Sequence, residues 1–326
     1  MALSSTTLFL CVPALAIAMT SGAAVAQPTS APIPGTDCPA FPANGWWHAD
    51  VSKLPVHKRS KQWLGHMSKK AKLHPDFGPS YGEQPVPYGI PITVVAGTHP
   101  KVTVTFQYAS ESDQVPYPLG DDTMVEGGQY TSGDRHTVVI DSSTCRLYET
   151  WATRRSGATW SAGSGAAWDL NSNNLRTRTW TSADAAGLPI LPGLLRYEEV
   201  AAGTIDHAIR FTTDMSDKSF LWPARHQAGS VSNQNYPPMG ARFRLKPTYV
   251  ISAKLRPDTK AVLQAMKKYG MVLADNGSPW YFQGTSDDRW PEALLDQLKT
   301  IPASAFEAVD TSSLMLSPNS MQVITP

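Results

Sequence analysis

Three acidic residues are candidates for acid–base catalysis: Glu149, Glu199 and Asp206. Glu149 interrupts an otherwise apolar strand face, where a carboxylate is costly unless it is paired or functional. Cleavage of a glycosidic bond needs one protonated carboxyl and one ionised carboxylate that attacks or activates water. Burial raises a carboxyl pKa and a neighbouring Arg lowers it, so these acids offer both environments. His136 and His207 are alternative proton carriers. For each acid, the ordinary alternative is an Arg pair or a turn cap.

Other polar residues of the same region begin or end predicted strands or lie in loops: Asp134, Asp169, Asp184 and His226. They widen the set of acids and bases from which a site could be assembled, but spacing alone does not bring them together.

Aromatic residues supply a second indication. The chain has ten Trp among 326 residues, several of them in polar, loop-like contexts. Flat aromatic faces stack on sugar rings, so Trp222, Trp280 and Tyr281 are the predicted stacking surface. The alternative is core packing, which we expect for Trp151 and Trp168.

Arginines form a third group. Arg242, Arg244 and Lys246 share one face of a predicted strand. Arg210 takes the corresponding face of an earlier strand. If these strands are neighbours, the open sheet face is cationic and suits the carboxylates of a uronate-containing glycan, which a lyase would cleave. The alternative is cross-strand pairing with Asp or Glu.

Motifs of other chemistries are absent. The sequence contains no G-x-S-x-G, H-E-x-x-H, Walker A loop or G-x-G-x-x-G, so we expect no cofactor. None of the eight His is paired at ligand spacing on a helix face. A metal site built from distant strands, for instance His136 and His207 with a carboxylate, stays an alternative.

Net charge limits the partners. The chain has 28 Lys and Arg against 27 Asp and Glu, a formal charge of +1. A nucleic-acid binder held by bulk electrostatics would have a large basic excess. We expect a polysaccharide or cell-envelope glycan as partner, no nucleic acid, and a monomer.

The N-terminus predicts export to the periplasm or the extracellular space. Residues 8–19 are apolar, and Ala24-Val25-Ala26 fits a signal-peptidase site, which gives a signal peptide over residues 1–26. The segment before the apolar run lacks Lys and Arg, which departs from the pattern. The run is shorter than the ~20 residues that span a bilayer, and charges or Pro interrupt every later apolar run. The mature chain keeps Cys38 and Cys145, which predict one disulfide between an N-terminal arm and a central strand.

Residues 27–45 are rich in Pro, Ser, Thr and Ala and are predicted to be an extended arm. Residues 53–72 carry seven Lys or Arg and no acid, with Trp63, Leu64 and Met67 at helical spacing. This pattern predicts a short amphipathic helix with a basic outer face. That face is either solvated or a contact for an anionic glycan.

From residue 92 the hydrophobic period becomes two. Alternating runs predict half-buried strands over residues 102–108, 136–140, 145–151, 205–211 and 241–246. In the C-terminal third, the patterns predict helices over residues 257–269 and 290–298. Between them, residues 271–277 are predicted to form a strand followed by a tight turn. Residues 46–326 are therefore predicted to form a single, mainly β domain. It has an antiparallel β-sandwich or jelly-roll-like core with peripheral α-helices.

Several segments together resemble a family of secreted bacterial proteins. They include Pro116-Tyr117-Pro118, Asp134-Arg135-His136, residues 163–166, residues 181–197 and residues 268–281. The resemblance covers about residues 46–309. It implies an exported single-domain protein, and it implies no catalytic residue.

These observations favour an exported enzyme that hydrolyses a polysaccharide with carboxylates as acid and base. A lyase that acts on a uronate-containing glycan, or a non-catalytic glycan-binding or envelope-binding protein, is the alternative. Two carboxyls about 5–9.5 Å apart beside a groove would favour hydrolysis.

Overall fold

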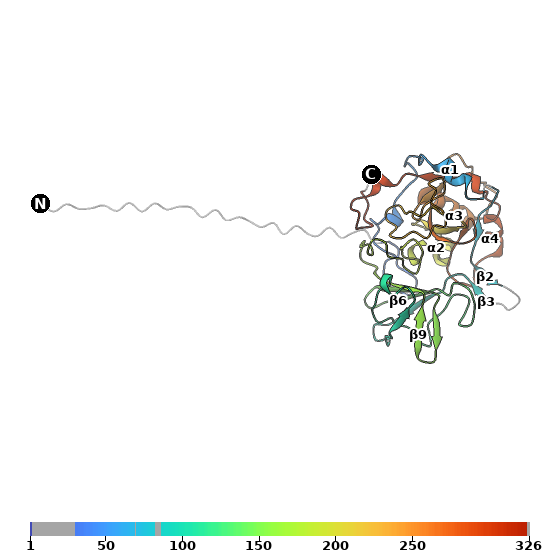
Figure 1. Ribbon diagram of the computed structural model, residues 1–326. Helices are drawn as coiled ribbons and strands as arrows, with labels where there is room; N and C mark the ends of the chain where they lie inside the picture. The colour runs from blue at the N-terminus through green and yellow to red at the C-terminus, as the bar shows by residue number, and fades with distance from the viewer. Residues whose placement is uncertain (2–29, 69, 82–85, 325–326) are drawn as a thin grey trace.

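Within the described residues, four β-sheets form the framework of the fold. Figure 1 shows the computed structural model, which describes Met1 and residues 30–68, 70–81 and 86–324. Helices α1 to α4 gather at one end, and strands β6 and β9 lie at the other. Apart from Met1, the predicted signal peptide and the first residues of the predicted arm lie outside the described residues. No helix within the described residues has the length and apolar character to cross a membrane.

The largest sheet has six strands in the order β1-β14-β11-β13-β12-β15. Its strands are β1 (His74–Pro75), β11 (Ile209–Thr213), β12 (Arg242–Leu245), β13 (Met271–Asn276), β14 (Tyr281–Phe282) and β15 (Phe306–Val309). The pairing is mixed, because β11 runs parallel to β13 while β12 is antiparallel to β13 and to β15. Side chains from this sheet and from the helices pack together in the larger hydrophobic core.

A four-stranded sheet in the order β10-β7-β6-β4 separates two hydrophobic cores. Its strands are β4 (Ile92–Val95), β6 (Thr137–Asp141), β7 (Arg146–Trp151) and β10 (Ser164–Asp169). Alternate residues of a strand point to opposite faces. Val138 and Ile140 accordingly pack into the larger core, and Val139 packs into the smaller one. β6 is buried on both faces, which explains its β-branched run.

Two smaller sheets complete the strands. Strands β5 (Val104–Phe106), β8 (Arg154–Ser156) and β9 (Thr159–Ala162) cover the smaller core in the order β5-β9-β8, and β2 (Gly78–Tyr81) pairs with β3 (Val86–Tyr88). The helices are α1 (Ser60–Gly65), α2 (Tyr197–Ala202), α3 (Pro257–Lys268) and α4 (Glu292–Leu298), with short 3-10 turns at Trp46–His48, Ala109–Glu111, Leu191–Gly193, Ala303–Ala305 and Ser312–Leu314.

In helix α3, residue types account for the start, the buried face and the end of the helix. Pro257 occupies the first turn, where its missing N–H has no helical partner. Val262 and Met266 lie one turn apart and are buried, so one stripe of the helix faces the core. Lys267 and Lys268 lie in the last turn, where cations interact favourably with the helix dipole. Gly270 follows at φ +75°, a conformation that ends helices.

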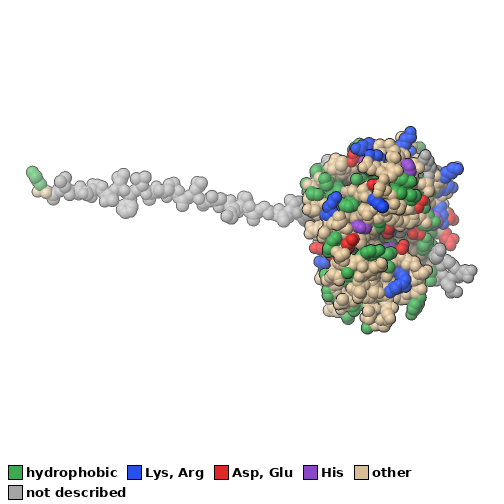
Figure 2. Space-filling view, in the orientation of Figure 1, with side chains coloured by type: hydrophobic (Ala, Val, Ile, Leu, Met, Phe, Trp, Pro, Cys, Tyr) green, Lys and Arg blue, Asp and Glu red, His purple; other side chains and the backbone are tan. Residues whose placement is uncertain are grey.

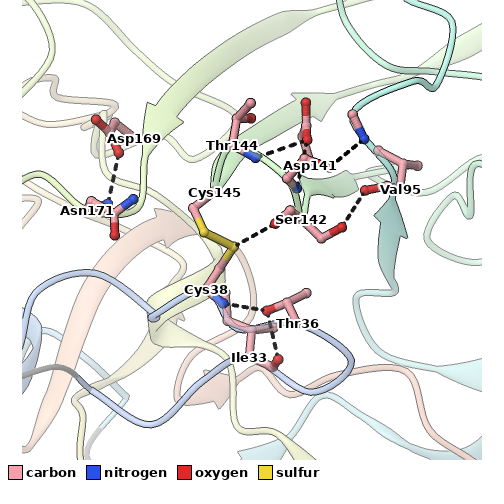
Figure 3. The surroundings of a disulfide bond; sticks show 12 residues. Ile33, Thr36, Cys38, Val95, Asp141, Ser142, Thr144, Cys145, Asp169 and Asn171 are labelled. Carbon is pink, nitrogen blue, oxygen red and sulfur yellow. Dashed lines mark hydrogen bonds between the residues drawn. A yellow bond between two sulfur atoms is a disulfide. The ribbon is translucent and has the colours of Figure 1, made fainter.

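The predicted disulfide is present. Cys38 and Cys145 are bonded across a sequence separation of 107 residues, and Figure 3 shows the N-terminal segment held against the start of β7. The amide of Cys38 donates to Oγ1 of Thr36, which in turn donates to the carbonyl of Ile33. The described part of the arm is therefore packed onto the domain, and Cys38 and Phe41 are buried in the larger core.

The mainly β fold with peripheral helices confirms the predicted fold class, and the four-stranded sheet between two cores gives it a sandwich-like layering. The sheets are mixed and curled, and parallel pairs such as β4 with β6 and β5 with β9 occur beside the antiparallel ones.

Candidate functional site

A cavity of about 360 Å³ lies where the four-stranded sheet meets the six-stranded sheet. Trp151 ends β7 and Ser164 begins β10 on one side, and Asp275 and Asn276 end β13 on the other. The loop over residues 181–185 forms a further wall. Figure 2 shows acidic and His side chains along the waist between the two ends of the molecule.

Four carboxyl-bearing residues line this cavity: Glu111, Asp134, Asp184 and Asp275. They come from segments far apart in the sequence, and none belongs to the three acids expected from the sequence. The sequence places Asp134 at the start of a predicted strand and Asp184 in a loop, whereas Asp275 lies in the segment predicted to be a strand and tight turn. No Lys or Arg is among the residues that line the cavity within the described ranges.

A bulge in β13 positions Asp275. Leu273 pairs with Phe211 and Asp275 pairs with Thr212, so Ala274 is the extra residue. Bulges bend a strand locally and re-aim its side chains, often beside functional sites. The carbonyl of Ala274 accepts the amide of Ala186 at 2.8 Å, and this bond fastens the Asp184 loop to the bulge.

Arg210 joins the two carboxyls. Its Nε and Nη2 donate to the two oxygens of Asp184 at 3.0 and 2.7 Å, and its Nη2 lies 3.8 Å from Oδ2 of Asp275. Both partners of the bidentate pair are buried, with side chains at most 2% exposed. Asp184 therefore holds Arg210 in place and is itself closed off from a substrate.

The Asp275 carboxyl differs from Asp184 in exposure and pKa. Its side chain is 23% exposed and contributes to the cavity wall. Burial, together with the nearby charge of Asp184, raises its pKa to about 7, against the opposing effects of Arg210 and His136. A carboxyl with this pKa is a proton donor near neutral pH.

His136 belongs to the same electrostatic network. Its Nδ1 lies 2.6 Å from Oε2 of Glu126. Burial opposes its charged form, but the Glu126 carboxylate outweighs burial and raises the pKa of His136 to about 9. His136 Nε2 is buried without a hydrogen-bond partner in the described structure. The positive charge of His136 acts on Asp275 and opposes the rise in the pKa of that carboxyl.

His226 also lines the cavity. Its Nδ1 lies 2.9 Å from the carbonyl of Ala185, and since a carbonyl only accepts, Nδ1 carries the proton. Neutral His226 therefore has its lone pair on Nε2, which lies 3.8 Å from Oε2 of Glu111.

Two aromatic side chains also line the cavity. The rings of Tyr108 and Trp151 are stacked, with centroids 6.4 Å apart and planes at 29°. Tyr108 is 46% exposed, and Trp151 Nε1 donates weakly to Oδ1 of Asp134 at 3.4 Å. Trp151 packs against the larger core, as expected, and its side chain also contributes to the cavity wall.

The two serines of the wall are not arranged as nucleophiles. The Ser164 hydroxyl donates to the carbonyl of Ser182 at 2.6 Å. The Ser182 hydroxyl lies 2.6 Å from the carbonyl of Leu188 and accepts the amide of Asp184 at 2.9 Å. Both hydroxyls therefore hold the loop that carries Asp184.

Glu149, the first acid expected from the sequence, is fully buried near this site. Its carboxyl accepts the amides of Ile190 and Leu191 and the indole N–H of Trp168. Burial raises its pKa to about 7 although these donors oppose the rise. Glu149 is not among the residues that line the cavity, and its contacts organise the turn that begins at Leu191.

Glu199, Asp206 and His207 lie apart from the cavity lining. Glu199 belongs to α2, pairs with Arg196 and accepts from His207 Nε2 at 2.9 Å. His207 Nδ1 contacts the carbonyl of Ala208, so both ring nitrogens are used. Asp206 is partly exposed beside His48, 3.7 Å from its Nδ1. The structure pairs Glu199 with His207 but brings neither to Glu149.

The three residues expected to stack on a sugar, Trp222, Trp280 and Tyr281, do not line the cavity. Trp280 has no exposed surface, so the prediction that it stacks on a sugar is wrong; it packs against Phe211 and Phe243, and its indole donates to Met67. Trp222 is partly buried and donates to the carbonyl of Ser320. Tyr281 stacks on His74 at 3.9 Å.

The prediction of an open cationic sheet face is also wrong, because the N-terminal segment covers that face. Arg242 donates to the carbonyls of Trp46, Trp47, Ala49 and Tyr269. In the same way, the second arginine of the strand is buried: Arg244 donates to the carbonyls of Val51, Ser52 and Leu54 and pairs with Glu307. Arg210 is the one member of the predicted group that contributes to the cavity network.

His136 and His207 have different partners, Glu126 and Glu199. In the part of the chain that the structure describes, no three His, Cys, Asp or Glu side chains are grouped to hold a metal ion. The distant-strand metal site suggested as an alternative is thus not assembled from these residues.

Comparison with known proteins found no matching family model, no matching curated protein and no matching solved structure. The cavity and its network are therefore interpreted from their own geometry and chemistry.

Proposed function

We propose that the protein is an exported hydrolase that cleaves a glycosidic bond of a polysaccharide in the cavity between the two sheets. The observation that carries this proposal is the Asp275 carboxyl, which lines the cavity and shares Arg210 with a second, closed-off carboxyl.

In this proposal Asp275 is the general acid. With a pKa of about 7, it holds a proton that it transfers to the glycosidic oxygen as the bond to the sugar breaks. Asp134 is the second carboxyl, because it lines the same cavity and is exposed. It attacks the anomeric carbon or removes a proton from the attacking water. Arg210 and Asp184 act as positioning residues that fix the charge around Asp275.

The stacked rings of Tyr108 and Trp151 support a carbohydrate as the substrate. Aromatic faces pack against the C–H faces of sugars, and a cavity with an aromatic side and several polar groups is the common form of a small-molecule site. The rings lie beside the carboxyls that would carry the reaction.

Hydrolysis is favoured over elimination by the charge of the cavity. A uronate lyase needs a cation to neutralise the substrate carboxylate. The described lining residues include no Lys or Arg, and Arg210 is occupied by Asp184 and Asp275. The two remaining acids of the described lining, Glu111 and Asp134, further disfavour a uronate by like-charge repulsion. Export is supported by the Cys38–Cys145 disulfide together with the predicted signal peptide.

A panel of neutral and acidic polysaccharides tests the proposal. The purified mature protein is incubated with each, and new reducing ends and the ultraviolet absorbance of unsaturated products are followed. We expect reducing ends from a neutral polysaccharide without unsaturated product, and their loss in Asp275→Asn. Folded protein that releases nothing from any substrate would contradict hydrolysis, and unsaturated product would indicate the lyase.

A further inference from the structure

A second hollow lies at the end of the molecule that carries α1. It has a volume of about 620 Å³, and three lysines from two distant parts of the chain line it: Lys58, Lys61 and Lys246. We call it the lysine groove. It shares no lining residue with the acidic cavity. Figure 2 shows Lys and Arg side chains gathered over this end.

The lysines of the groove have few acidic partners. Lys58 and Lys61 are exposed and form no ion pair with any residue that the structure describes. Glu307 also lines the groove, but Arg244 neutralises it through contacts at 2.8 and 2.9 Å. Hydrogen bonds from Ser312 lower the pKa of Asp310, and the nearby charge of Lys58 lowers it further. The groove therefore keeps a positive balance.

Lys246 is held in place by the fold. Its Nζ donates to the carbonyl of Ser304 at 2.7 Å, which leaves its other two N–H donors for a ligand. A lysine that is already ordered loses less side-chain entropy when it binds an anion.

Between the lysines, the groove has an apolar and aromatic surface. Val56 is 49% exposed, and Leu64 of α1 lines the same hollow. His57 stacks on Trp63 with ring centroids 4.1 Å apart. Burial lowers the pKa of His57; the charge of Asp310 opposes this effect, and Lys58 and Arg59 add to it. The backbone amide of Arg59 donates to Nδ1 of His57, so the neutral His57 ring carries its proton on Nε2.

We propose that the lysine groove binds a chain of acidic polysaccharide. Its carboxylates are recognised by Lys58, Lys61 and Lys246, and the C–H faces of its rings lie on Val56 and Leu64. Charge complementarity argues for a polyanion, and the apolar strip argues for a ligand with apolar faces between its charges. A flat anionic lipid surface would meet the rim of this concave site rather than its floor. The inference stands apart from the proposed hydrolysis, because it concerns a different surface.

Binding of polygalacturonate tests this inference, with highly methyl-esterified pectin as the matched uncharged chain. Affinity electrophoresis of the intact protein compares wild type with Lys58→Ala/Lys61→Ala. The control is Lys218→Ala/Lys254→Ala, which removes the same charge from exposed lysines outside the groove. We expect about tenfold weaker binding for the groove variant, and less than about twofold for the control. Lys246→Ala weakens binding in the same direction. Thermal melting verifies that all variants are folded.

Equal losses in the two double variants would overturn the proposal, because they would show unspecific attraction. Equal binding of the esterified pectin would overturn it by removing the role of charge. Groove-dependent binding to vesicles that contain phosphatidylglycerol, without binding to polygalacturonate, would assign the groove to a lipid instead.

Discussion

Asp184 and Asp275 share one guanidinium nitrogen: Nη2 of Arg210 lies 2.7 Å from Oδ1 of Asp184 and 3.8 Å from Oδ2 of Asp275. The two carboxyl oxygens are thus no further apart than the sum of these distances. Like charges this close favour protonation of one member, and the less tightly paired one is Asp275. The arrangement separates the roles, since Asp184 holds Arg210 and Asp275 keeps its proton at the cavity.

The aromatic pair is expected to bind substrate without taking part in the chemistry. Replacement of Trp151 or Tyr108 by Ala should raise KM about 2- to 10-fold with little change in kcat, because ring stacking contributes to ground and transition states alike. Steady-state kinetics on the cleaved polysaccharide measure this. Tyr130→Ala, an exposed ring outside the cavity lining, is the control. A fall in kcat with unchanged KM would argue against a stacking role.

The Glu126–His136 pair is expected to make stability depend on pH. The pKa of His136 is raised from 6.5 to about 9, so its stabilisation is fully present below pH 6.5 and is lost as the pH rises through about 9. The lowered pKa of Glu126 stabilises the fold above its ordinary value of 4.5, and this contribution is lost as the pH falls through the lowered pKa. Urea unfolding should therefore show a loss of ~2–3 kcal/mol between pH 6.5 and pH 9.

Glu126→Gln tests the origin of this loss. The variant should be less stable than wild type at pH 6.5, and the gap should narrow toward pH 9 and above. A direct NMR titration of the His136 ring in wild type provides a check that does not depend on the variant folding. A His136 pKa at or below 6.5 would contradict the account.

The disulfide is expected to stabilise the whole domain. It closes a loop of 107 residues, and constraint of the unfolded chain by a loop of that size corresponds to about 4–5 kcal/mol. Cys38→Ser/Cys145→Ser should lower the free energy of unfolding by about that amount, as measured by urea denaturation without reductant. Dithiothreitol should destabilise wild type but not the variant. Equal stability of variant and wild type would show that the bond adds nothing.

Much of the fold could be predicted from local patterns. Alternation located β6, β7 and β12, and helix signals located α3 within one residue of its ends. These succeeded because strand and helix periods are local properties of the sequence. Alternation did not reveal what covers each face. Arg242 and Arg244 were expected on an open face, and the distant segment around Trp46 and Val51 buries them instead.

The site was less predictable for the same reason. Glu149 was recognised as an acid on an apolar face, and it is buried with a raised pKa. Two of its donors, the amides of Ile190 and Leu191, come from a distant turn, and the third is the indole of Trp168 on the neighbouring strand. Asp275 gave only a turn signal, because its position depends on the bulge at Ala274 and on pairing with β11. Contacts between residues separated by tens of positions depend on how sheets pack, which local sequence periods do not encode.

The pH dependence of kcat/KM tests the central claim most directly. If Asp275 is the general acid, kcat/KM on the cleaved polysaccharide falls as the pH rises through about 7, because the proton is then lost. Asp275→Asn should reduce kcat/KM by about 10²- to 10⁴-fold and abolish the fall in kcat/KM near pH 7. Asp296→Asn, at a largely exposed acid of α4, should behave like wild type. An Asp275→Asn enzyme with the wild-type rate and the wild-type pH profile would contradict the account.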